Sequence, residues 1–237
     1  MRDVNQANPE LQWPIFRRQA YVQAVLEQFL EPVPAPRSLC VGRFMFGERR
    51  QGLSTFVQRE LMIELQHRGV SSVYLPMKGF LLQDPAARLK WSLALDEGDG
   101  QTLLDLLQIR LQETPAGLIV FIDDVDLLQL TRAGRALQSD LKVACEAIRE
   151  TRDQRGPVRV VGLSAEPKML AMMTTGPSAI WPQASVERFQ PMGVAYVRWL
   201  LAQLGDQLSP RLRDENVAMD CFRRSRYCPG VLREVLL

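Results

Sequence analysis

The stretch Gly117-Leu-Ile-Val-Phe-Ile122, followed by Asp123-Asp124-Val125-Asp126, predicts a buried strand that ends in acidic residues. Its apolar run is short and rich in branched and aromatic side chains, which is typical of a strand covered on both faces. On either side of it, short apolar runs alternate with longer stretches of helical periodicity. This alternation favours βαβ units, so we predict an α/β fold with a mainly parallel sheet flanked by helices.

The other elements follow from periodicity and from the positions of proline and glycine. We expect strands at 39–46, 70–75, 158–163 and 185–189, and helices at 16–30, 54–67, 103–111, 131–152 and 167–173. Residues 77–100 are expected to form loops and a short helix, and the pattern is all helical after Pro191. We therefore predict a flexible arm at 1–14, an α/β core at 15–190 and a small helical lid at 191–237.

The composition excludes several classes of protein. A chain of 237 residues with 46% hydrophobic residues and a net charge of only +2 is not a disordered chain. No apolar run approaches the roughly 18–20 residues of a membrane helix, and the polar opening residues do not read as a secretory leader. The four cysteines and the single His67 match no common zinc pattern. We therefore expect a cytoplasmic protein with reduced thiols and no membrane insertion.

A glycine-rich segment follows the first predicted strand. Gly47-Glu-Arg-Arg-Gln-Gly52-Leu53-Ser54-Thr55 matches G-x-x-x-x-G-K-[ST] in spacing and context, except that Leu53 replaces the lysine. The glycines let backbone amides point inward to form an anion nest, and Ser54 is placed to coordinate magnesium. Leucine cannot supply the missing charge, for which the candidates are Arg49, Arg50 and Lys78. The alternative is an ordinary glycine-containing turn that binds nothing.

The acids after the central strand are the second candidate site. In a fold with a phosphate-binding loop, Asp123 at the carboxyl end of the strand would hold magnesium through water. Asp124 would then orient or deprotonate the attacking water. The alternative is an aspartate pair that caps a helix.

Three further features are open to two interpretations each. Ser164, at the end of the strand at 158–163, would sense a γ-phosphate or cap the helix that begins at Pro167. Arg233, in Pro229-Gly-Val-Leu-Arg233, would reach a nucleotide between core and lid or would be solvated. The cluster Arg223-Arg224-Ser-Arg226-Tyr227 would contact nucleic acid or form a solvated basic helix face.

The order of these features resembles the AAA+ and STAND group of P-loop ATPases. Within that group the chain is most similar to the archaeal-ATPase, origin-initiator and transposition-ATPase branches. Ile15-Phe16-Arg17-Arg18-Gln-Ala-Tyr21-Val22 also resembles the short box that precedes the first core helix in those proteins, where the adenine is usually cradled. The resemblance covers residues 15–237 and departs from the family pattern at Leu53.

The resemblance implies ATP or ADP with Mg²⁺ as cofactors. It implies magnesium ligation by Ser54 and Asp123, and catalytic roles for Asp124, Ser164 and Arg233. It implies nucleotide contacts from Phe16, Arg17, Gly47, Arg49, Arg50, Gln51, Gly52, Leu53, Ser54 and Thr55. Such proteins often assemble side by side with an arginine of one subunit at the next subunit's nucleotide, for which the candidates are Arg152, Arg155 and Arg188.

Three functions remain open at this stage. The first is a nucleotide-binding module with weak or no hydrolysis that acts as a switch or subunit in a larger protein assembly. The second is a scaffold for protein–protein interaction that keeps the fold without a ligand. The third is an ATPase that uses a displaced cation and acts with nucleic acid. Protein partners or further copies of the chain are expected in all three, and the replacement of lysine by Leu53 leaves enzymatic activity undecided.

Overall fold

The computed structural model describes residues 15–30, 42–78, 85–93, 102–114, 116–150, 158–175, 179–182 and 184–236. The expected arm at 1–14 and the candidates Arg152 and Arg155 lie outside these ranges. Within them, no helix is both long enough and apolar enough to cross a membrane. The described cysteines, Cys145, Cys221 and Cys228, form no disulfide.

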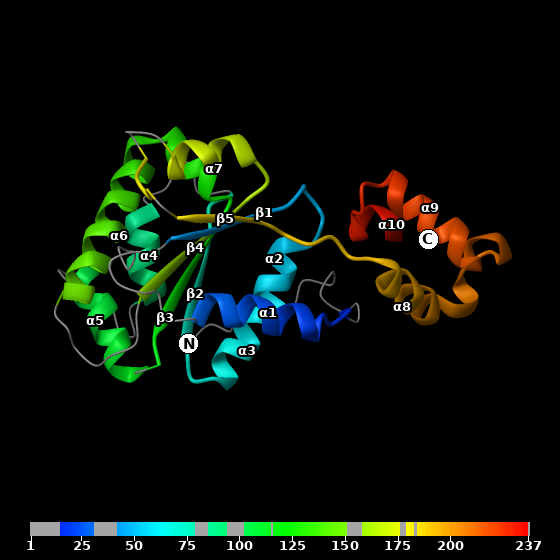
Figure 1. Cartoon of the computed structure of the whole chain (residues 1–237), viewed down its shortest axis with the longest axis horizontal. Helices are drawn as coiled ribbons and strands as arrows, with labels where there is room; N and C mark the ends of the chain where they lie inside the picture. The colour runs from blue at the N-terminus through cyan, green and yellow to red at the C-terminus, as the bar shows by residue number, and fades with distance from the viewer. Residues whose placement is uncertain are drawn as a thin grey trace.

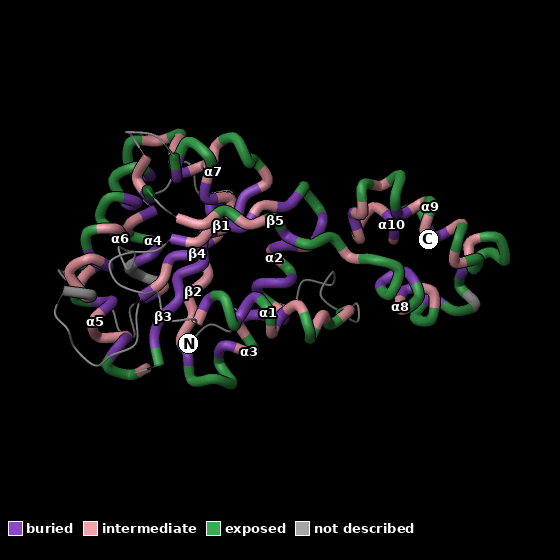
Figure 2. Tube along the Cα trace, viewed as in Figure 1, coloured by how far each residue is buried: buried purple, intermediate pink, exposed green. Residues whose placement is uncertain are grey.

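The centre of the molecule is a parallel five-stranded sheet in the order β2-β3-β4-β1-β5 (Figure 1). Its strands are β1 (Arg43–Phe46), β2 (Ser71–Pro76), β3 (Leu118–Asp123), β4 (Val158–Ser164) and β5 (Ser185–Arg188). The central strands β3 and β4 are buried along most of their length, as Figure 2 shows. The predicted α/β class with a parallel sheet is confirmed.

Helices cover both faces of the sheet, and more helices follow it in the chain. Those that precede or flank strands are α1 (Gln19–Leu30), α2 (Leu53–Phe56), α3 (Met62–His67), α4 (Pro85–Leu93), α5 (Leu103–Glu113), α6 (Arg132–Glu150) and α7 (Pro167–Thr174). After β5 come α8 (Val194–Leu204), α9 (Glu215–Arg224) and α10 (Pro229–Leu236), with short 3₁₀ turns at η4 (Gly205–Gln207) and η5 (Pro210–Arg213). We call the part from α8 to α10 the lid.

Three buried clusters hold these layers together. On one face of the sheet, side chains of α4, α5, α6 and α7 pack against alternate strand residues such as Phe44 and Val120. On the other face, α1, α2 and α3 pack against the intervening residues such as Met45 and Phe121. The lid has its own cluster, centred on Tyr196 and Phe222. Figure 1 shows the lid at one end of the core, joined to it by the segment after β5.

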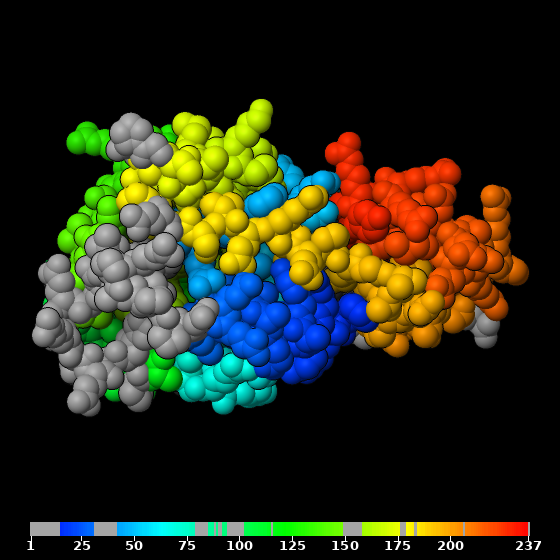
Figure 3. Space-filling view, in the orientation of Figure 1, coloured from blue at the N-terminus to red at the C-terminus, as the bar shows by residue number. Residues whose placement is uncertain are grey.

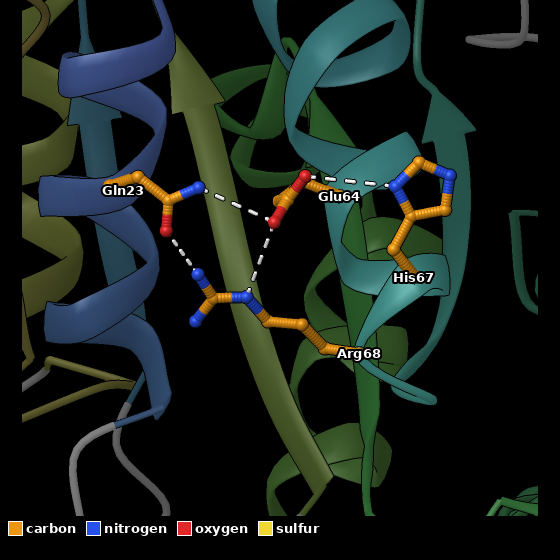
Figure 4. Close-up of polar contacts among 4 residues, drawn as sticks. All are labelled: Gln23, Glu64, His67 and Arg68. Carbon is orange, nitrogen blue, oxygen red and sulfur yellow. Dashed lines mark hydrogen bonds and ion pairs between the residues drawn. The ribbon is translucent and has the colours of Figure 1, made fainter.

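Polar contacts fasten α1 to α3 at the surface (Figure 4). The Glu64 carboxylate accepts a hydrogen bond from Gln23 Nε2 at 3.3 Å and lies 3.5 Å from Arg68 Nε. Arg68 in turn donates to Gln23 Oε1, and His67 Nδ1 lies 3.7 Å from Glu64. Glu64 is therefore shared by both helices.

Two helices differ from the sequence expectation. The helix predicted from 131 is preceded by a 3₁₀ segment, η3 (Val125–Leu130), and α6 crosses it so closely that a Cβ at Gly134 would lie 2.3 Å from the Leu128 carbonyl oxygen. The helix predicted at 54–67 contains a π-helical segment, η2 (Val57–Leu61), between α2 and α3. Within η2 the buried Glu60 carboxylate accepts the Arg18 backbone N–H at 2.5 Å.

Candidate functional site

The predicted phosphate loop lies between β1 and α2, at the carboxyl edge of the sheet. Gly52 has a φ of +92°, a left-handed conformation that glycine adopts without strain. Inside the turn, Gln51 Oε1 accepts the Glu48 backbone N–H at 3.0 Å, and only 3% of Gln51 is exposed. One amide that would face an anion in an open nest is therefore already bonded to the loop's own side chain.

Leu53 does not project from this loop into solvent. It is 9% exposed and belongs to the buried cluster that also contains Phe56, Val57 and Phe189. The position of the expected lysine is therefore part of the apolar core.

The acid pair lies at the same edge of the sheet, together with two cations. Asp123 ends β3, and Asp124 follows with a φ of +50° and donates its backbone N–H to Asp123 Oδ1 at 3.0 Å. Burial raises the pKa of Asp124, and the charges of Asp123 and Asp126 raise this pKa further. The charges of Lys78 and Arg49 lower the pKa of Asp124, so both cations lie near the acid pair. Arg50 instead forms an ion pair with Glu234 of α10.

Ser54 and Asp123, the two predicted magnesium ligands, come together around a third residue. The Tyr74 hydroxyl donates a hydrogen bond to Asp123 Oδ2, and Ser54 and Gln58 hydrogen-bond to the same hydroxyl. Burial raises the pKa of Tyr74, and Asp123 raises it further. Tyr74 thus stays a neutral phenol that bridges the two predicted ligands.

Magnesium does not fit this arrangement as it stands. The ion demands near-octahedral coordination by oxygen atoms that are free to bind it. Both carboxylate oxygens of Asp123 already accept protein hydrogen bonds, one from Tyr74 and one from Asp124.

Ser164 uses its hydroxyl within the fold. It is 4% exposed, donates to Asp126 Oδ1 and accepts the Glu166 backbone N–H at 2.9 Å. Because Glu166 immediately precedes α7, this geometry favours the helix-start interpretation of Ser164.

The residues of the predicted adenine box lie against the lid. The Phe16 ring centroid is 5.6 Å from those of Tyr196 and Trp199 in α8, whereas Arg17 is exposed. Arg18 is the inward-facing arginine of the pair, since its guanidinium lies 4.1 Å from the Tyr21 ring centroid and donates to the Gln190 carbonyl at 2.8 Å.

The lid contacts the phosphate loop directly, and Figure 3 shows the two in contact. Gln51 Nε2 donates to the Arg226 carbonyl oxygen at 3.3 Å, and the Cys228 thiol donates to the Arg49 carbonyl oxygen at 3.2 Å. Arg50 lies over Gly230, where an added Cβ would be 3.5 Å from its Nη2 atom. Three consecutive loop residues therefore bond to the lid.

A cleft of about 570 Å³ lies beside these contacts, between loop, β5 and lid. It is lined by Glu48, Gln51, Arg188, Phe189, Gln190, Pro191, Arg223, Arg226 and Tyr227. Arg233, expected at this junction, is absent from the lining and lies near Tyr196. Burial raises the pKa of Tyr196, the charge of Arg233 lowers it, and the net result is a pKa of about 12.

Tyr74 and Asp126 were not predicted to belong to the site, and Gln51 was predicted only as a nucleotide contact. A usable signal existed for the first two, because both are polar groups near the carboxyl ends of adjacent strands, where parallel strands meet. No signal in the sequence distinguishes a Gln51 that contacts a ligand from one that folds back into its own loop.

Comparisons with known proteins identify the fold. No protein-family model matches the chain, and no curated protein matches it in sequence. A Walker-type ATPase of Pyrococcus abyssi aligns with 92% of this chain and 66% of that protein at 15% identity and a TM-score of 0.62. The ORC2 protein of Aeropyrum pernix, in ADPNP–ADP complexes, aligns with 98% and 70% of the two chains at 15% identity and a TM-score of 0.59.

The replication initiator DnaA, bound to AMPPCP and single-stranded DNA, aligns with 97% of this chain and 66% of that protein at 13% identity and a TM-score of 0.54. The chain spans about two thirds of the length of each of these three solved chains. At such identities the likeness is one of fold, and the fold is that of an AAA+ P-loop ATPase.

Proposed function

We propose that this chain is a nucleotide-binding module that hydrolyses its nucleotide weakly or not at all and acts as a switch or subunit in a larger assembly. The observation that supports this best is the cleft of about 570 Å³ between phosphate loop and lid. It opens beside the carboxyl ends of parallel strands, where ligands bind in open α/β sheets, and its volume is in the range of ligand pockets. The known proteins of this fold described above include complexes with ADP, ADPNP and AMPPCP.

Weak hydrolysis follows from two features of the phosphate end. Leu53 supplies no charge to a transferring phosphoryl group, and loss of one such stabilising group costs about 10²–10³ in rate in other enzymes. Tyr74 hydrogen-bonds to Asp123 and to Ser54, so both predicted magnesium ligands already have a partner within the protein. Arg49 and Lys78 remain as the cations nearest the acid pair.

Calorimetric titration of the full chain with ATP and with ADP at millimolar concentration tests the proposal. We expect saturable binding that weakens by at least about tenfold when Arg49→Ala and Lys78→Ala are combined, because each cation neutralises phosphate charge. Arg132→Ala, an exposed change in α6, serves as the control. Phosphate release is expected to stay near the buffer level. The absence of any binding would overturn the proposal.

A scaffold without ligand is the second candidate, and the side chain of Gln51 favours it. Its carboxamide bonds Glu48 within the loop and Arg226 in the lid, so the loop is satisfied without an anion. If neither nucleotide binds while the chain still assembles with partner proteins, the scaffold interpretation holds.

The partners belong to the same proposal. Protein partners or further copies of this chain fit a switch of this fold. Arg188, the described one of the three arginines considered for a neighbouring nucleotide, lines the cleft of its own chain. Solved structures of this fold include complexes with DNA, among them those of the Aeropyrum pernix ORC1 protein and of DnaA. Nucleic acid is therefore a further candidate, and its binding should weaken steeply with added salt if phosphates are contacted.

A further inference from the structure

We propose that the cleft holds the polyphosphate of its nucleotide without a divalent metal, with Arg188, Arg223 and Arg226 supplying positive charge in addition to Arg49 and Lys78. The inference rests on the proposed function and specifies its ligand, a metal-free nucleoside di- or triphosphate. Three observations support it, namely the hydrogen bonds of the expected metal ligands, the absence of ion pairs at the three arginines among the described residues, and the shape of the turn that presents Arg226.

The expected metal ligands are already bonded to one another through Tyr74. Its hydroxyl contacts Asp123 and Ser54, and the other oxygen of Asp123 accepts the Asp124 backbone N–H. A magnesium ion at this position would compete with a half-buried hydrogen bond from the Tyr74 phenol to the Asp123 carboxylate. The charge that neutralises a bound polyphosphate is therefore expected from elsewhere.

The three arginines that line the cleft are available for an anion. Within the described residues, none of them has an ion-pair partner, although Arg224 pairs with Asp220 at 2.8 Å and Arg198 with Glu215 at 2.8 Å. The only acidic residue in the cleft lining is Glu48, so the cleft keeps a net positive charge. Guanidinium groups bind phosphate oxygens through two parallel N–H donors.

The turn after α9 fixes Arg226 against the phosphate loop. Arg226 and Tyr227 both have positive φ, at 57° and 59°, and the Arg226 carbonyl accepts the Gln51 side chain at 3.3 Å. The Tyr227 ring packs edge-on against Phe222 at 5.4 Å. The backbone of Arg226 is thus bonded to the phosphate loop, while its guanidinium remains exposed in the cleft.

Calorimetric titration with ATP and ADP, in excess EDTA and separately in excess magnesium, tests the inference on the full chain. We expect binding in EDTA that is at least as tight as in magnesium, because magnesium reduces the phosphate charge that the arginines recognise. Arg223→Gln and Arg226→Gln should each weaken binding in EDTA by about tenfold, which corresponds to 1.4 kcal/mol. Arg224→Gln is the matched control, since its side chain is paired with Asp220 and does not line the cleft.

The two proposals fail in different ways. Binding that requires magnesium, or that is indifferent to Arg223→Gln and Arg226→Gln, would overturn the metal-free mode and leave the nucleotide module standing. Absence of binding in both buffers would overturn the module itself. If a single-stranded oligonucleotide bound through the same two arginines and excluded ATP, the cleft would be a nucleic-acid site and the inference would be wrong.

Tyr74→Phe gives an independent test of the first step. Removing the hydroxyl frees Ser54 and one oxygen of Asp123, so the variant should bind ATP more tightly in magnesium than in EDTA, unlike the unmodified chain. If the ratio of the ATP affinities in magnesium and in EDTA is the same in Tyr74→Phe as in the unmodified chain, the phenol does not exclude the metal. Thermal unfolding of the variant checks that the fold is retained.

Discussion

Gln51 has the most consequential side chain in the phosphate loop. Its amide oxygen takes the place of an anion at the Glu48 N–H, and its amide nitrogen bonds the lid. A ligand that uses the loop amides must displace it. Identical spacing of glycines is therefore compatible with an open nest or with one closed by its own glutamine.

Gln51→Ala should weaken the fold and strengthen the site. Two hydrogen bonds of a buried side chain are lost, so we expect a loss of about 1–3 kcal/mol in the free energy of unfolding. ATP should nevertheless bind more tightly, because the Glu48 N–H becomes available. Gln66→Ala, an exposed change in α3, should alter neither quantity. Weaker ATP binding in Gln51→Ala would mean that the glutamine contacts the ligand and does not exclude it.

At the scale of elements, periodicity and parallel-strand logic predicted the architecture. The expected strands at 70–75, 117–122 and 158–163 lie within one residue of β2, β3 and β4 at each end. Short segments that are rich in β-branched and aromatic residues and flanked by glycine or proline favour strands over helices. The π-helical segment η2 and the 3₁₀ segment η3 were not predicted. They depend on which side chains meet after folding, such as Glu60 with Arg18, and no local pattern encodes that contact.

Gly134 allows α6 to cross η3, and Gly134→Ala should disturb that crossing. A new Cβ would lie 2.3 Å from the Leu128 carbonyl oxygen, a backbone atom that cannot rotate away. Such overpacking typically costs 1–3 kcal/mol, which exceeds the gain of about 1 kcal/mol in helix propensity. We expect a lower midpoint in urea. Gly193→Ala is the control, since its Cβ would meet no atom within 4 Å.

The stabilisation that comes from the contact between α1 and α3 should depend on pH. The hydrogen bond from Gln23, together with Arg68 and His67, holds the pKa of Glu64 below its ordinary value of 4.5. A carboxylate with a lowered folded pKa stabilises the fold above the unfolded pKa, and this contribution is lost as pH falls through the folded value. At pH values below about 4.5, we therefore expect the melting temperature to decrease with falling pH less steeply in Glu64→Gln than in the unmodified chain. Equal acid sensitivity of the two proteins would contradict this role for Glu64.

At the scale of the whole molecule, contacts between the lid and the phosphate loop lead us to expect that the two open as one cooperative unit. Arg49, Arg50 and Gln51 each bond to the segment 226–234, and the cleft takes its lining from both sides. The fold class and the presence of the C-terminal helices were predictable from the sequence. The three contacts were not, because they join residues separated by more than 170 positions.

Hydrogen exchange should show this cooperative unit when nucleotide binds. At ligand concentrations of about one hundred times Kd, binding adds about 2.7 kcal/mol, so exchange that requires ligand release should slow by about a hundredfold. We expect this protection at 47–52 and at 225–230 together, with no change in α5. Protection confined to the loop would show that the lid does not take part.

The ion pair between Arg50 and Glu234 links α10 to the phosphate loop. Glu234 lies on α10 next to Val235, whose side chain is 52% exposed. A protein that binds α10 at Glu234 and Val235 would shift the position of Arg50 and, through it, that of the neighbouring Gln51. Thermodynamic linkage is reciprocal, so a ligand in the cleft would alter the affinity of that protein for α10 by the same factor. Binding in the cleft would then change the binding of a partner at α10, although that partner does not contact the ligand.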